Sequence, residues 1–100
     1  MGATRQRYEA ARLEIEGALG EAAARLRAAQ ATETLLRREA SPQARAGVQA
    51  VLAGYGQGRG ELAAITAQRQ LRDIELRLLQ SQMEAQVELA AIERLIGSDL

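Results

Sequence analysis

Residues 54–60 read GYGQGRG, with a glycine at every second position. The rest of the chain is rich in alanine, leucine, arginine, glutamate and glutamine, which are strong helix formers. Each glycine in a helix interior costs about 1 kcal/mol relative to alanine. This density of glycine predicts that a helix stops here and that the chain turns at residues 56–61, which we call the tip.

The composition excludes several classes of functional site. Thirteen arginines balance 13 acidic residues, so the chain has no basic surface of the kind that attracts nucleic acid. Cysteine and histidine are absent, which removes thiol nucleophiles, imidazole bases and the usual zinc ligands. Glu84 and Glu88 share a helix face, but one such pair usually faces solvent. We therefore expect a protein that is not an enzyme, with no cofactor, no metal site and no nucleic-acid partner.

The first arm runs over residues 3–55, and its residues 4–40 have the heptad pattern of a coiled coil. Apolar residues recur every seven positions, with two leucines between them: Tyr8, Ile15, Ala22, Ala29, Leu36, Leu19 and Leu26. The alanines predict a close approach of the facing helix. Ser41-Pro42 interrupts the pattern, because proline inside a helix removes a hydrogen bond and clashes with the preceding turn. We expect a kink there, between segments 3–40 and 42–55, with Ser41 as the cap of the second segment.

The second arm, residues 61–97, repeats the pattern and carries additional apolar residues. The heptad positions are Leu71, Leu78, Ala85 and Ile92, joined by Leu89 and Ile96. A further set widens the apolar surface beyond one stripe: Ile65, Ile74, Leu79, Met83 and Leu95. Gly97 stands where a helix is expected to stop. The sequence predicts an all-α fold, a single long antiparallel two-helix hairpin over residues 1–100.

The two arms are unequal in length, so the first arm is expected to extend past the second. At about 1.5 Å per residue the arms would measure roughly 80 Å and 55 Å. Two helices with broad apolar faces also cannot bury those faces against each other alone. We therefore expect the isolated chain to self-associate, as paired hairpins in a four-helix arrangement.

The tip has two readings that the residues alone leave open. A phosphate-binding loop would need a Lys-Ser/Thr pair and a preceding strand, and an RNA-binding segment would need repeated Arg-Gly pairs. Neither pattern is present. What remains is a plain turn, in which glycine adopts φ > 0 without strain, or a turn that also docks a partner.

A set of short motifs in residues 42–97 carries a family resemblance. In order they are Tyr55-x-x-Gly58, Arg59-Gly60, Leu62-x-x-Ile65, Ala67-Gln68-Arg69 and Leu95-Ile96-Gly97. Together they resemble the last helical hairpin of the TolC-like outer-membrane efflux proteins, and most closely the heavy-metal efflux branch. Residues 1–40 fit this hairpin by length and period rather than by motif.

The resemblance implies a fragment of a larger protein that acts in transport. Members of the family are homotrimers, whose helices form a periplasmic tube below an outer-membrane β-barrel. The hairpin tips meet a periplasmic adaptor, which links the duct to an inner-membrane pump. By position, Tyr55, Gly58, Arg59 and Leu62 would dock the adaptor, and Gly56 and Gly60 would bend the backbone. The implied function is the export of metal ions or small toxic compounds. The chain itself would be the periplasmic portion of an outer-membrane protein.

Some residues depart from the family pattern, and two other readings stay open. Ser41 and Thr66 replace usual apolar residues, and Ala64 and Ala67 stand where some members carry acidic residues that narrow the pore. One alternative is the α-hairpin of the periplasmic adaptor itself, which also has heptads and an arginine at its tip. The other is a free-standing coiled-coil module that only dimerises.

Overall fold

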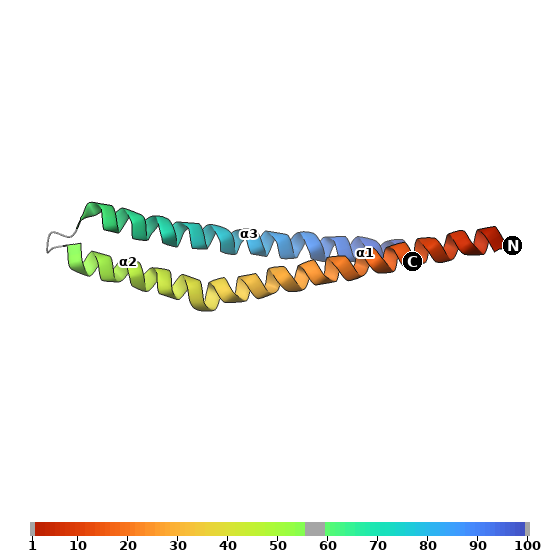
Figure 1. The fold of residues 1–100 in the computed structure, drawn as a ribbon, viewed down its shortest axis with the longest axis horizontal. Helices are drawn as coiled ribbons and strands as arrows, with labels where there is room; N and C mark the ends of the chain where they lie inside the picture. The colour runs from red at the N-terminus through yellow and green to blue at the C-terminus, as the bar shows by residue number, and fades with distance from the viewer. Residues whose placement is uncertain (1, 56–59, 100) are drawn as a thin grey trace.

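The computed structural model describes residues 2–55 and 60–99 and confirms the all-α hairpin. Helix α1 runs over Gly2–Leu35, a short π-helical segment η1 over Leu36–Ala40, and α2 over Ser41–Tyr55. These three segments form one continuous arm. Helix α3, Glu61–Asp99, returns antiparallel to it along most of its length (Figure 1). The turn between α2 and α3 falls where the glycines predict it.

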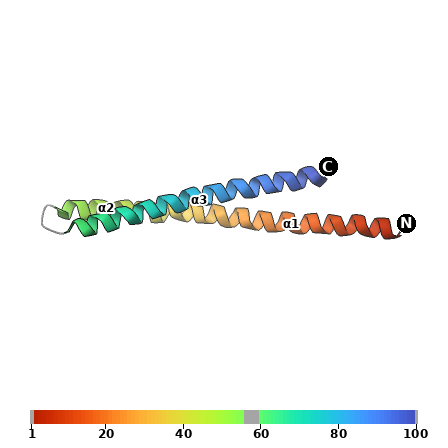
Figure 2. The same ribbon diagram turned by 90° about the horizontal axis from the view of Figure 1, so that it is seen from above.

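The molecule is a thin rod. Its extents are 83 × 19 × 15 Å and its radius of gyration is 22.5 Å, whereas a compact domain of 100 residues has about 13 Å. The arms are separated near the tip in Figure 1 but overlap there in Figure 2, and the reverse holds at the other end. The two arms therefore wind around each other, as expected for helices that share a heptad pattern.

The bend in the first arm lies at η1, immediately before Pro42 (Figure 1). Here the N–H of Ser41 donates to the carbonyl of Leu36, five residues back, so one turn is wider than an α-helical turn. The wider turn accommodates the proline ring, which would otherwise clash with the carbonyl four residues before it. The expected kink is confirmed. The expected cap is wrong, because Ser41 has helical dihedral angles (φ −65°, ψ −48°) and continues the helix.

The π turn also shifts the face that the first arm presents to α3 by one residue. A heptad counted from Leu36 would place Gln43, Gly47 and Ala50 against α3, but all three are exposed. The positions that are partly buried instead are each one residue later: Ala44, Val48 and Val51. The extra residue held in the wide turn keeps the apolar residues of α2 facing α3.

The core is a narrow strip between the arms, which we call the seam. Ala22, Ala29 and Leu36 are its buried apolar residues, as the heptad predicts. Ile15, Leu19 and Leu26 are half-buried. Alanine at the centre of the seam lets the backbones approach, but a two-helix seam cannot enclose larger side chains completely.

Two details at the ends of the rod concern the length of the arms. The first arm extends past the C-terminal end of α3 (Figure 2), and Tyr8, a heptad residue in this overhang, is 68% exposed. Gly97 does not end the second arm, since α3 continues to Asp99. That prediction was wrong because one glycine weakens a helix by only about 1 kcal/mol.

Candidate functional site

The tip is the site that the sequence predicts, and the structure describes it in part. Helix α2 ends at Tyr55 and α3 begins at Glu61. Of the residues expected to dock or bend, Gly56, Gly58 and Arg59 lie outside the described residues. Gly60 and Leu62 are described in full, and Tyr55 as the end of the α2 backbone.

Gly60 is the residue at which the chain enters α3. Its φ of +45° lies in the left-handed region that glycine adopts without strain. Its carbonyl accepts hydrogen bonds from the N–H groups of Ala63 (3.1 Å) and Ala64 (3.4 Å), so it closes the first turn of the helix. The acidic Glu61 stands in this turn, where the helix dipole favours negative charge. The backbone therefore favours glycine at this position, whatever the tip binds.

Leu62 lies in the first turn of α3 with 75% of its surface exposed. A leucine exposed to this extent at the end of a hairpin is available to a partner, although single exposed leucines are common on protein surfaces. The docking role of Leu62, like that of Tyr55, Gly58 and Arg59, stays a prediction.

Polar contacts between the arms form a second group of notable residues, far from the tip. The Nε of Arg25 on α1 donates to Oε1 of Glu88 on α3 at 3.0 Å. Eight residues further along α1, Oε1 of Glu33 accepts from Nε2 of Gln82 at 3.3 Å and from Arg37 on its own arm. These contacts fix which residues of the two arms lie opposite each other.

Glu88 is the most enclosed of these charged groups, with only 16% of its side chain exposed. Its Oε2 is buried and has no hydrogen-bond partner among the described residues. The expectation that the Glu84/Glu88 pair faces solvent is therefore wrong for Glu88. A polar residue at a seam position lowers stability but favours one register over its neighbours.

A heptad count that included polar residues would have found this group. Ser81 and Glu88 fall in the series Ile74, Ser81, Glu88, Leu95 at intervals of seven. Ser81 is only 3% exposed, and its hydroxyl donates to the carbonyl of Leu78 at 2.8 Å. Glu33 likewise stands seven residues after Leu26. Counting apolar residues alone hides these members of the seam.

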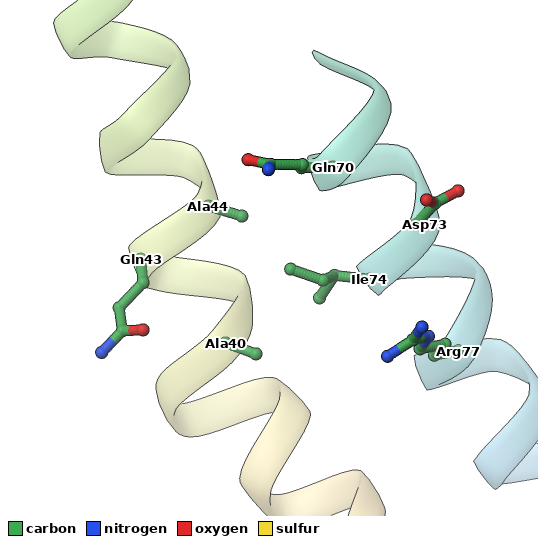
Figure 3. A pocket seen from close by; sticks show the side chains of 7 residues that line it. All are labelled: Ala40, Gln43, Ala44, Gln70, Asp73, Ile74 and Arg77. Atoms are coloured by element: carbon green, nitrogen blue, oxygen red, sulfur yellow. The ribbon is translucent and has the colours of Figure 1, made fainter. Parts of the chain in front are cut away.

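An open groove of about 430 Å³ lies between the arms beside the bend (Figure 3). Ala40 and Ala44 on the first arm point toward Ile74 on α3, while Gln43 and Asp73 point away from the gap. The groove is present because the first arm places only the small side chains of Ala40 and Ala44 opposite Ile74 where it bends. It holds no arrangement of nucleophile and base, and among the described residues no cluster of acidic side chains could hold a metal ion.

Both arms also carry apolar side chains on the surfaces that face away from the seam. On α3 these are Leu76, Leu79, Met83 and Val87, which we call the outer stripe; each is more than half exposed. On α1 the corresponding surface is built mainly of small residues between two exposed leucines: Leu13, Gly17, Gly20, Ala24, Ala28, Ala31 and Leu35. The expectation of an apolar surface wider than one stripe holds for Ile65, Leu79 and Met83, whereas Ile74 and Leu95 are half-buried in the seam.

No protein-family model, curated protein or solved structure matches this chain. The resemblance to efflux ducts thus rests on the motifs alone. No helix in the described part of the chain is both long and apolar enough to cross a membrane.

Proposed function

We propose that this chain is the periplasmic helical part of an outer-membrane efflux duct, which docks a periplasmic adaptor through its tip and exports metal ions or small toxic compounds. The observation that carries the proposal is the placement of apolar surface on both arms, facing away from the seam. A hairpin of this kind can be covered on both sides by neighbouring helices, as in the wall of a tube. The motifs of residues 42–97 are the reason for proposing an efflux duct rather than another helical tube.

In this proposal the chain acts by assembly rather than by catalysis. The duct would be a homotrimer that cooperates with the adaptor and an inner-membrane pump. Tyr55, Gly58, Arg59 and Leu62 would contact the adaptor. Gly60 would set the direction in which α3 leaves the tip, and its left-handed φ supports this assignment.

The test is a bulky substitution at the tip in the bacterium that carries the gene. With Gly58→Trp we expect loss of metal-ion export, measured as a lower tolerated metal concentration, while the amount of protein in the outer membrane is unchanged. Gly2→Trp is the matched control at the far end of the rod, where an added side chain has open space. If Gly58→Trp exports normally, the tip does not dock the adaptor.

The free-standing coiled-coil module is the second candidate, and the polar contacts within the seam favour it. Arg25–Glu88 and Glu33–Gln82 are the kind of contacts that let a hairpin fix its own register without neighbours. The complete reading frame separates the two candidates. A duct predicts a signal peptide, an earlier copy of the hairpin and strand-forming segments around this chain. A free-standing module predicts none of these.

A further inference from the structure

The outer stripe of α3 is the largest group of neighbouring, well-exposed apolar side chains that the structure describes. Leu76, Leu79, Met83 and Val87 follow one another at intervals of three and four residues, so they lie along one side of the helix. Beside Met83 and Val87 runs an open groove of about 460 Å³, lined also by Gln80 and Glu84. The outer stripe is therefore an apolar face of α3 that the first arm leaves uncovered.

The charges beside the outer stripe indicate what covers it. Arg77 and Glu84 each follow a stripe residue by one position, so both lie on the same flank of α3, between the outer stripe and the seam. Arg77 also lines the groove between the arms (Figure 3). Both residues are exposed, and neither forms an ion pair with another described residue of its own chain. One edge of the stripe therefore carries a positive and a negative charge seven residues apart.

This charge pattern is complementary to itself. If a second copy of α3 packs antiparallel on the stripe, a twofold axis perpendicular to the helices brings equal edges together. With the axis near Gln80 and Ser81, Arg77 of each copy lies opposite Glu84 of the other. Such a twofold contact closes on itself, which is the commonest arrangement of two identical chains.

We propose that two copies of this chain pair antiparallel through the outer stripe of α3, with reciprocal Arg77–Glu84 ion pairs along its edge. Leu76 and Leu79 of one copy pack beside Val87 and Met83 of the other. The pairing concerns the chain by itself and does not depend on the duct proposal. It specifies which face is used in the self-association that the broad apolar surfaces predict.

The test is a charge exchange on the 100-residue chain. Molar mass is measured by light scattering at tens of micromolar, and the dissociation constant by sedimentation equilibrium. The unchanged chain is expected to be a dimer. Arg77→Glu and Glu84→Arg are each expected to raise the dissociation constant at least about tenfold, because each brings like charges together twice. The double variant Arg77→Glu/Glu84→Arg restores opposite charges and is expected to return the constant to within about twofold of the original.

Two further variants separate this face from the outer surface of α1. Met83→Glu places a charge in the outer stripe and is expected to give a monomer. Ala24→Glu places the same charge on the exposed surface of α1 and is expected to leave the dimer intact. Circular dichroism of each variant shows that the helices are still formed.

Three outcomes would overturn the pairing. They are a monomeric unchanged chain, a double variant that associates no better than the single variants, and a dimer that is lost with Ala24→Glu but kept with Met83→Glu. The last result would place the second copy on α1.

Discussion

The two halves of the hairpin, on either side of the π turn, are held together differently. Between α1 and the C-terminal part of α3 lie the buried residues Ala22 and Ala29 and both cross-arm polar contacts. Between α2 and the N-terminal part of α3, no described residue beyond Ser41 is buried on the α2 side. Leaving Glu61 aside, no side-chain hydrogen bond joins described residues of the two arms in that half. The register is therefore fixed far from the tip, and the half that carries the tip is held by partly buried apolar contacts.

The largest loss of stability is expected when the seam residues of α1 are moved out of phase with α3. Deletion of Ala24, an exposed residue, would turn the seam residues that precede it by about 100° relative to those that follow it. We expect a loss of about 3 kcal/mol or more in the free energy of unfolding, because Ile15, Leu19 and Ala22 would leave the interface. Urea unfolding at a fixed protein concentration, followed by circular dichroism, measures it.

Deletion of Arg38 is the matched control within the π turn. Removing one residue there converts the wide turn to an ordinary one and keeps α2 in phase with α3, so we expect a change within about 1 kcal/mol. Equal losses for the two deletions would show that the π turn does not accommodate an extra residue.

A larger side chain at the centre of the seam should have the next largest effect. Ala22 is 1% exposed, so Ala22→Leu has to push the arms apart, and we expect it to lower the free energy of unfolding by about 2 kcal/mol. Ala24→Leu adds the same atoms on the exposed side of α1 and should change it by less than about 0.5 kcal/mol. A small effect of Ala22→Leu in thermal unfolding would mean that the arms are not closely packed in this half.

The smallest effect is expected near the tip, where the helix depends on its own backbone preference. Gly54 lies in the last turn of α2, and a methyl group added to it meets no atom within 4 Å. Gly54→Ala should therefore raise stability by about 0.5–1 kcal/mol. Hydrogen exchange of the α2 amides should slow correspondingly. Faster exchange in Gly54→Ala would show that α2 needs this glycine.

Gly60→Ala is the opposite case, because the left-handed φ strains any residue with a Cβ. A loss of about 1 kcal/mol in the free energy of unfolding is expected.

Much of the fold followed from the periodicity of the sequence, and its limits have physical causes. The hairpin, the turn and the bend were predictable because glycine and proline act locally. The one-residue shift after the bend was not, since a π turn depends on how α2 meets α3 rather than on Pro42 alone. Glu88 is hidden when only apolar residues are counted along the heptad, and its partner Arg25 lies 63 residues away in the sequence. At the tip, the glycines predicted a turn with φ > 0, which Gly60 adopts, whereas partner contacts depend on a second molecule.

The rod shape has a consequence for how this chain moves in solution. Helical N–H bonds lie nearly parallel to the helix axis, and here every helix runs along the 83 Å dimension. Almost all amides should therefore sense the slow end-over-end rotation, so their nuclear spin relaxation should resemble that of a heavier, compact protein. Because the rod is long for its mass, a single chain should also elute early from a sizing column, as a compact dimer would.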